Sequence, residues 1–344
     1  MAIAIVFTQN SDTGPAAYRI PFATQWAFAG VAVIAAFILP ESPVWLVAQD
    51  RLDKARAAMH RLGTDRDPSF LHRIQMTLNS EEDGTGRGGQ MATFAECFQG
   101  RTDLRRTLVI VWLNILQQFV GMSLLTNAAY FLLMAGMSPK HALMVKLIGV
   151  ASNMIANMAT WYTAPRFGRR TIILFSIALD FFAWLAMGIA GCFDTAAANW
   201  FVGVALLLFG FFNSFGVASA VPIVAAEISC VRLRSKSQGI GFGAQCIMSW
   251  VFSFFTPYLY NTDEANWGGK IGFFFAGLSI IGYVVTWCVV PETKGRTFME
   301  LDWLFETGVR ASRFGGAVVP TEGLGGGGEA KRVGAGQAES KEDF

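Results

Sequence analysis

The sequence predicts an all-α protein that crosses a membrane several times. Of its 344 residues, 53% are hydrophobic and 15% are charged, whereas about a quarter of the residues in a soluble domain are charged. The apolar residues are gathered into long runs, which prolines, glycines and basic residues separate. A helix of about 20 apolar residues crosses the hydrocarbon core of a bilayer. We therefore expect a helical membrane bundle with about seven complete transmembrane helices.

The first complete span is predicted at residues 21–40, where an apolar run ends at the prolines of P-E-S-P-V-W-L (40–46). Proline lacks an amide hydrogen and ends a helix at such positions. Residues 1–7 are apolar but too few to span, and they lack the basic start and the cleavage site of a signal peptide. We interpret residues 1–40 as the end of one transmembrane helix followed by a complete one.

Residues 41–106 differ in character, because charges alternate there with apolar residues at helical spacing. This pattern predicts short amphipathic helices in a linker domain. The linker is rich in Lys and Arg, which favours the cytosol. Nucleic-acid binding is disfavoured, because acidic residues are interleaved with the basic ones and no stacking aromatic residues accompany them.

Six more spans are predicted in a bundle over residues 107–290. They cover 107–136, 140–164, 171–192, 200–226, 239–260 and 271–290. The turns at 165–170, 227–236 and 291–297 are basic, while the loops between them hold few basic residues. This alternation predicts that the basic turns and the tail 291–344 are cytosolic. After residue 310 the tail is rich in glycine and charge, which predicts disorder.

Polar side chains lie in the middle of the span 107–136, among them Gln117, Gln118, Ser123 and Asn127. Amide groups in hydrocarbon are costly unless they face a bundle interior or a wet cavity. At about 100° per residue, Gln117 shares a face with Gly121 and Leu124, and Ser123 and Asn127 lie beside it. Neutral donors and acceptors on an inward face suit a neutral, hydroxyl-rich ligand. The alternative is that these groups only bond neighbouring helices.

Isolated charges inside the spans are also informative. Lys146 lies within 140–164 and is expected to snorkel or to face a cavity. Asp180 is a lone acid within 171–192.

Three basic turns recur at helix ends on the predicted cytosolic side. They are G-R-R (168–170), R-L-R (232–234) and K-G-R (294–296), and the acids Glu41, Glu227 and Glu292 lie at span ends. Crossed acid–base pairs of this kind form an interface that is made or broken as helix bundles move. Taken singly, each basic turn would report only the orientation of the chain in the membrane.

Together these motifs resemble the sugar porters of the major facilitator superfamily, most closely the fungal α-glucoside (maltose-type) permeases. Q-Q-x-x-G followed by Y-F-x-x-x-A-G (117–136) is similar to the seventh helix of that family, and P-E-S-P-V-W-L to its signature P-E-S-P-R-W-L. G-R-R, E-x-x-x-x-R-x-R and P-E-T-K-G are similar to its gating motifs. The resemblance implies a partial major-facilitator bundle over residues 18–307, equivalent to the sixth helix and the C-terminal half.

The resemblance also implies roles for residues. Gln117 and Gln118 would contact a sugar, and Ser123, Asn127 and Gln245 are the other candidates for the substrate site. A network of charges would govern opening at the cytosolic face, and its members would be Glu41, Arg51, Arg169, Arg170, Glu227, Arg232, Arg234, Glu292 and Lys294. The expected activity is transport of an α-glucoside or hexose, coupled to protons, in the plasma membrane and without a cofactor.

Several positions depart from the family pattern. Ser123 stands where hexose porters carry a sugar-binding Asn, and Leu133 where many members have Glu. Pro165 replaces an acidic residue before R-F-G-R-R, and A-S-A-V-P at 218–222 replaces a G-P pair. Phe242, Gly243 and Cys246 stand where α-glucoside porters carry an Arg and two Asn, and Gln245 is the only strongly polar group left there. The resemblance therefore does not define which sugar is bound.

The resemblance covers only part of a twelve-helix family. Helices one to four and the proton-coupling acid of the first helix have no counterpart in the sequence, so we expect a truncated product, an incomplete gene model or a chain that pairs with another porter. A membrane sensor that binds sugar without transporting it is the alternative. An enzyme is disfavoured, because no G-x-S-x-G, H-E-x-x-H or Walker motif appears. Scattered cysteines and histidines predict no metal site.

Overall fold

The computed structural model describes residues 16–63, 71, 93–193, 195–230, 233–261 and 263–317. All regular structure within these ranges is helical, which confirms the predicted all-α class. The helices are α2 (Ala16–Ile38), α3 (Pro43–Ala48), α4 (Leu52–Leu62), α6 (Glu96–Gln99), α7 (Arg101–Phe119), α8 (Met122–Thr126), α9 (Ala128–Met134), α10 (Pro139–Phe167), α11 (Arg169–Ala190), α12 (Ala196–Phe215), α13 (Val217–Ile228), α14 (Arg234–Tyr260), η1 (Gly268–Lys270), α15 (Ile271–Val289), α16 (Phe298–Glu306) and η2 (Ala311–Gly316).

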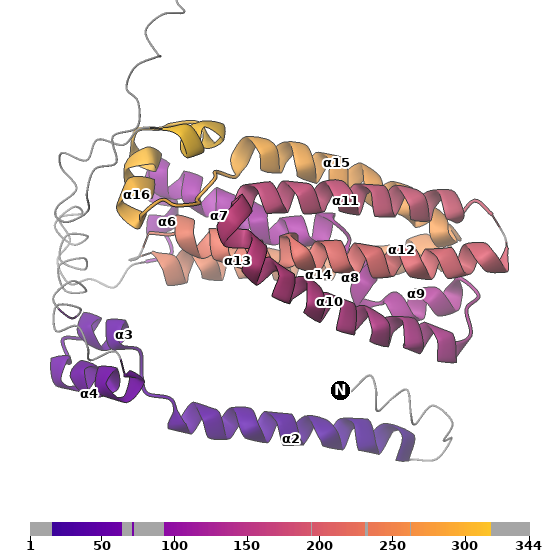
Figure 1. The fold of residues 1–344 in the computed structure, drawn as a ribbon, viewed down its shortest axis with the longest axis horizontal. Coiled ribbons are helices and arrows are strands. Elements are labelled where there is room, and N and C mark those ends of the chain that lie inside the picture. The colour runs from indigo at the N-terminus through magenta and orange to yellow at the C-terminus, as the bar shows by residue number, and fades with distance from the viewer. Residues whose placement is uncertain are drawn as a thin grey trace, which may run out of the picture.

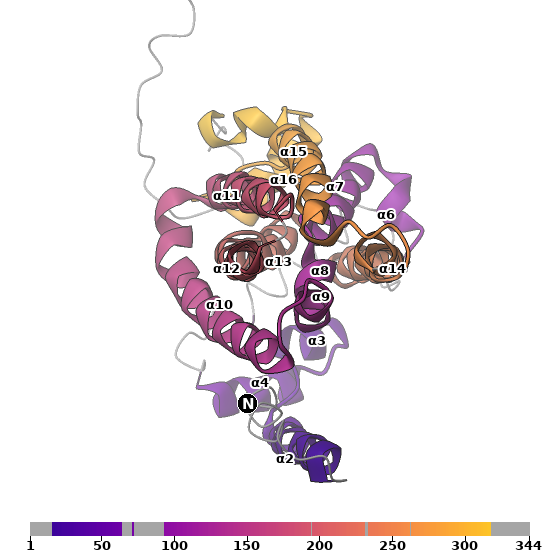
Figure 2. The same cartoon turned by 90° about the vertical axis from the view of Figure 1, so that its right-hand side faces the viewer.

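The long helices run side by side in one bundle, and α2, α3 and α4 lie apart from it (Figure 1). Viewed from its end, the bundle has α12 and α13 in its middle, between α10, α11 and the α7–α9 segment (Figure 2). Helix α11 packs extensively against α15 and α12, and α7 against α14. No comparably extensive contact joins α2 to another described helix.

Five helical stretches among the described residues are long and apolar enough to cross a membrane. They are Pro139–Phe167, Arg169–Ala190, Ala196–Ile228, Arg234–Tyr260 and Gly268–Val289. The other two predicted spans correspond to α2, whose apolar part Phe22–Ile38 is shorter, and to the segment α7–α9. The boundaries predicted for the linker and for the cytosolic tail remain predictions.

The predicted span 107–136 is not one helix. The prediction that its polar residues lie on one continuous helical face is therefore wrong. Helix α7 ends at Phe119, and Gly121 has a φ of +103°, a left-handed conformation that favours glycine. The short helices α8 and α9 follow, with a second interruption at Asn127. Positions on either side of Gly121 therefore do not share a face at 100° per residue.

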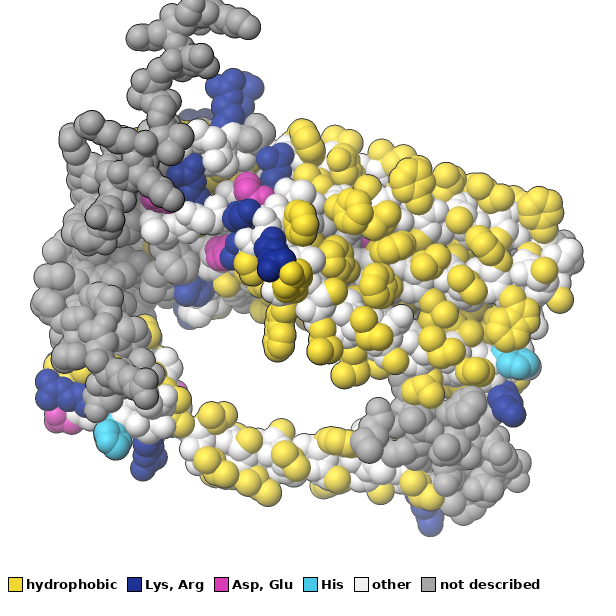
Figure 3. Space-filling model, viewed as in Figure 1, with side chains coloured by type: hydrophobic (Ala, Val, Ile, Leu, Met, Phe, Trp, Pro, Cys, Tyr) yellow, Lys and Arg dark blue, Asp and Glu magenta, His cyan; other side chains and the backbone are white. Residues whose placement is uncertain are grey.

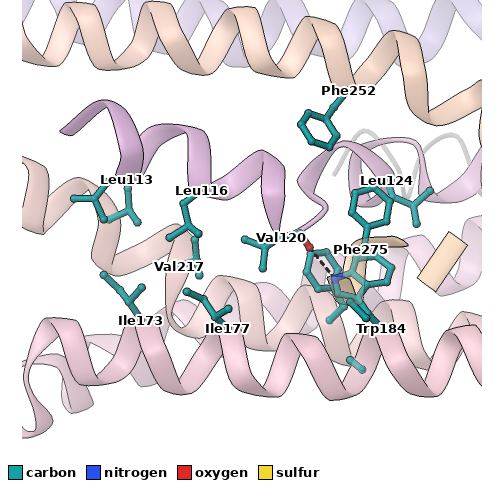
Figure 4. Close-up of a cluster of buried hydrophobic side chains, with 14 of the residues drawn as sticks. Leu113, Leu116, Val120, Leu124, Ile173, Ile177, Trp184, Val217, Phe252 and Phe275 are labelled. Atoms are coloured by element: carbon teal, nitrogen blue, oxygen red, sulfur yellow. Dashed lines mark hydrogen bonds between the residues drawn. The ribbon is translucent and has the colours of Figure 1, made fainter. Parts of the chain in front are cut away.

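Trp184 is fully buried in the core of the bundle, beside Val120 and Phe275 (Figure 4). Its indole ring lies 4.3 Å from the ring centroid of Phe209 and 5.1 Å from that of Phe275. The indole Nε1 donates a hydrogen bond of 2.7 Å to the carbonyl oxygen of Val120. Burying aromatic rings in such offset contacts stabilises a core beyond the area that they bury. Trp184 thus joins α11 to the end of α7.

A glycine seam, formed by Gly188, Gly191, Gly269 and Gly272, joins α11 to η1 and α15. A Cβ atom on Gly191 would lie 2.3 Å from the backbone carbon of Gly269, and one on Gly272 would lie 2.4 Å from the carbonyl oxygen of Trp184. Small residues allow two backbones to approach this closely, as membrane helices commonly do.

The outer surface of the bundle is apolar, and most charges visible in Figure 3 gather at the end where α7 begins and α16 lies. Large apolar side chains are exposed on α10 and on α2, such as Trp161 at 84% and Phe37 at 87%. An apolar surface of this extent is unusual for a soluble protein and typical of one in contact with lipid.

Candidate functional site

Two of the predicted substrate residues contact each other across the bundle. Gln117 lies near the end of α7 and Gln245 lies in α14, and both are half-buried. The side-chain nitrogen Nε2 of Gln245 donates a hydrogen bond of 3.0 Å to Oε1 of Gln117. The amide nitrogen of Gln117 and the amide oxygen of Gln245 are not used in this bond. The pair therefore offers both a donor and an acceptor to a ligand.

Gln118 and Ser123 are placed differently, because both are buried at 4% and 3% exposure. Oε1 of Gln118 and Oγ of Ser123 have no hydrogen-bond partner among the described residues. Asn127 is half-buried at the break between α8 and α9, and its Nδ2 donates to the carbonyl oxygen of Ser123 at 3.2 Å. Gln117, Asn127 and Gln245 are thus the predicted substrate residues that are partly exposed.

Lys146 faces a cavity, as its isolated charge predicts. The cavity has a volume of about 170 Å³ and lies between α8, α10 and α12. The ammonium group donates to the carbonyl oxygens of Leu125, at 3.4 Å, and Thr126, at 2.5 Å. These carbonyls belong to the interrupted α8–α9 segment, where a helical partner is missing, so the cation stabilises the interruption.

Polar residues outside the predicted substrate site also form hydrogen bonds between the helices. The side chain of Ser219 donates to Oδ1 of Asn157 at 2.7 Å, which joins α13 to α10. Near the end of α14, the hydroxyl of Tyr130 donates to Oδ1 of Asn261 at 3.4 Å. Asn153 and Asn157 are four residues apart within an apolar run, so they share one face of the helix. This spacing is the sequence feature from which a polar face of α10 could have been predicted.

The predicted charge network is assembled in part. Arg169 forms an ion pair with Glu227, with 3.0 Å between Nη2 and Oε1. The backbone amides of Arg169 and Lys294 both donate to Oε1 of Glu292 at 3.1 Å. The side chain of Lys294 also donates to the carbonyl oxygen of Arg166. Thus α11, α13 and the turn after α15 meet at one charge cluster, formed by Arg169, Glu227, Glu292 and Lys294.

Gly168 makes this charge cluster possible. Its φ is +92°, and a Cβ atom at this position would lie 2.6 Å from Oε2 of Glu292. The carboxylate of Glu292 therefore occupies the space that a Cβ atom at position 168 would fill. There it accepts hydrogen bonds from the backbone amides of Arg169 and Lys294.

The remaining predicted charges lie outside the charge cluster. Arg170 donates to the carbonyl oxygen of Trp287 at 2.6 Å and covers the Trp287 ring, and Arg234 donates to Oγ of Ser229 at 3.2 Å. Glu41 and Arg51 are exposed beside α3 and α4, and the structure does not bring them to the cluster. Arg232 lies outside the described residues.

Comparison with known families supports the interpretation of the sequence motifs. The profile of the family described as "Sugar (and other) transporter" matches residues 1–305. Among curated proteins, the MFS transporter fmqE of Aspergillus fumigatus is 32% identical over 318 residues, which are 91% of this chain and 59% of that protein. The general alpha-glucoside permease of Saccharomyces cerevisiae is 32% identical over 325 residues, 92% of this chain and 51% of the permease.

The chain thus spans about half the length of the curated relatives it matches. Among solved structures, the proton:xylose symporter XylE bound to 6-bromo-6-deoxy-D-glucose has a TM-score of 0.70 and 20% identity, covering 88% of this chain and 63% of the symporter. The inward open conformation of XylE from E. coli gives a TM-score of 0.61. These similarities confirm the fold that the sequence motifs predicted.

Proposed function

We propose that the bundle of this chain forms one half of a membrane pathway for a neutral sugar, because the chain belongs to the Sugar (and other) transporter family. Transporters of this fold place the substrate between two bundles that move against each other. A second bundle would complete the pathway here, because this chain spans about half the length of its relatives. The pair Gln117–Gln245 is the observation that carries the proposal.

The chemistry of this pair suits a sugar better than an ion. Two neutral amides offer donors and acceptors to vicinal hydroxyl groups without the desolvation cost of a charge. The relatives named as α-glucoside and maltose permeases favour an α-glucoside or a hexose as the substrate. The symporter among the structural neighbours favours coupling to protons. The plasma membrane, with a cytosolic C-terminus, is the proposed location.

The charge cluster would supply the gate of this pathway. Arg169 and Glu227 belong to α11 and α13 and are 21% and 23% exposed at their side chains. An ion pair that water can reach at its edge is exchanged for hydration at small free-energy cost, about 0–1 kcal/mol. Movement of α13 relative to α11 would therefore break this ion pair without a large barrier, as an alternating pathway requires.

Uptake of labelled maltose and glucose tests the proposal. Cells without their own sugar permeases would express the chain together with the N-terminal half of an α-glucoside permease. Replacing Gln117 by Ala should slow uptake at low sugar about fivefold, because a hydrogen bond to the sugar is worth about 1 kcal/mol. Gln238→Ala, at the start of α14, is the control and should leave uptake unchanged.

Uptake that is indifferent to Gln117→Ala would reduce the glutamine pair to a packing contact. Proton coupling predicts that the medium becomes alkaline when sugar is added and that a protonophore abolishes accumulation. Binding of maltose without uptake in any combination of halves would favour the alternative, a membrane sensor.

A further inference from the structure

Two adjoining open cavities lie away from the proposed sugar pathway, at the beginning of α7 and the end of α15. The first has a volume of about 500 Å³ and includes polar walls from Thr102 and Thr307. The second has a volume of about 450 Å³ and apolar walls that include Leu104 and Val289. Ligand cavities commonly have volumes of about 300–1,000 Å³. Both of these cavities are lined by Arg101 and Arg105.

The two arginines are four residues apart on α7, so they share one face of the helix. Neither forms an ion pair with an acid in the part of the chain that the structure describes. Their neighbour Arg106 differs, because it pairs with Asp302 at 2.6 Å. Glu306 is exposed at the rim of the first cavity. Like charges at this spacing repel each other, and an anion placed between them would relieve the repulsion.

Arg105 is held in position before any ligand arrives. Its Nη2 donates to the carbonyl oxygen of Val309 at 2.8 Å, and its guanidinium lies 5.3 Å from the ring centroid of Phe305 and 5.8 Å from that of Phe314. Partial burial lowers the pKa of the guanidinium, which nevertheless stays protonated. An ordered, partly desolvated cation binds phosphate oxygens with little further loss of side-chain freedom.

The apolar cavity continues from this basic cavity along α7 and the last turn of α15. Leu108 lies one turn beyond Leu104 and is 54% exposed, and Cys288 is exposed at the end of α15. We infer that the two cavities together bind a phospholipid with a net negative headgroup, with the headgroup between Arg101 and Arg105 and the upper acyl chain on the apolar wall. Such a lipid matches the two cavities in charge and in shape, since it is anionic at one end and apolar at the other.

Native mass spectrometry of the full chain, purified in detergent, tests this site with phosphatidylinositol and phosphatidylcholine as probes. Phosphatidylinositol should bind more tightly. The double variant Arg101→Gln/Arg105→Gln should bind it about thirtyfold more weakly, since each basic residue near an anionic lipid contributes about fivefold. Arg101→Gln alone should weaken binding about fivefold. This variant removes an exposed side chain and leaves folding intact.

Matched variants distinguish binding at this site from a general attraction of anionic lipids to basic residues. Arg310→Gln/Arg313→Gln removes two exposed charges outside both cavities and should leave phosphatidylinositol binding unchanged. Cys288→Trp fills the apolar cavity and should weaken lipid binding. Equal loss in the Arg310/Arg313 variant, or equal binding of phosphatidylcholine, would overturn the inference. Displacement of the lipid by inorganic phosphate at the same concentration would assign the cavity to a free anion instead.

Discussion

Arg169 contacts two acids from two different segments. Its guanidinium pairs with Glu227 of α13, while its backbone amide donates to Glu292 beyond α15. The sequence motifs predicted that these three residues belong to one network. They could not predict that Glu41 and Arg51 lie elsewhere, because a motif specifies which residue types recur and not which elements meet. The geometry of Gly168 depends on Glu292, 124 positions away, and is likewise invisible to local patterns.

The ion pair of Arg169 and Glu227 should show a measurable coupling. In a double-mutant cycle with Arg169→Gln and Glu227→Gln, we expect a coupling free energy of about 0.5–1 kcal/mol, reduced by added salt because the pair is partly open to water. Thermal unfolding in detergent measures it. A parallel cycle on Glu306 and Arg313, which form no ion pair in the described structure, should give a coupling near zero.

At the scale of elements, the interruption after α7 depends on contacts from a distant helix. The amide of Leu124 donates to the carbonyl oxygen of Gly121 instead of continuing the α-helical pattern, and the indole of Trp184 donates to the free carbonyl oxygen of Val120. The hydrophobic run 107–136 predicted one continuous helix, because the pattern of apolar residues contains no information about Trp184, which is 64 positions from Val120. The long uninterrupted helices α11, α14 and α15 could be predicted from their own sequence.

Replacing Gly121 by Ala should destabilise the bundle. A Cβ atom there would lie 2.6 Å from the Trp184 ring and would be held at a φ of +103°. We expect a loss of about 2–4 kcal/mol in the free energy of unfolding, from left-handed strain and overpacking together. The midpoint of thermal unfolding in detergent reports this loss.

Gly243→Ala is the matched control. Among the described residues, no atom beyond the adjacent positions and backbone of its own helix lies within 4 Å of a Cβ atom at Gly243, in the interior of α14. The change should leave stability equal or raise it by about 0.5–1 kcal/mol, because alanine favours a helix. Equal losses at both positions would show that the Trp184 contact does not position the interruption.

At the scale of the whole molecule, the alternation of basic and non-basic loops predicts the orientation in the membrane. The basic turns 165–170 and 291–297 do meet at one end of the bundle, as the contacts of Glu292 show. The apolar runs predicted the helical class, and five of the predicted spans correspond to helical stretches long and apolar enough to cross a membrane. The lack of extensive contact between α2 and the other described helices could not be predicted, because lipid and a neighbouring helix both favour the same apolar residues.

Cysteine labelling tests this orientation. In a variant whose native cysteines are replaced, Ser235→Cys and Lys140→Cys introduce exposed thiols at opposite ends of the bundle. An impermeant maleimide added to intact cells should label the cysteine at position 140 and reach position 235 only after permeabilisation. The reverse result would place the charge cluster on the outside and contradict the proposed gate.

The glycine seam between α11 and α15 limits where this bundle can change shape. Main-chain atoms of the two helices are already in van der Waals contact around Gly191 and Gly269, so neither helix can slide or tilt against the other without collision. The two helices form one stiff unit. Helices α10 and α14 differ from this unit, because only 17% of the apolar window of each is buried, so most of their surface is left to contact lipid or a second bundle.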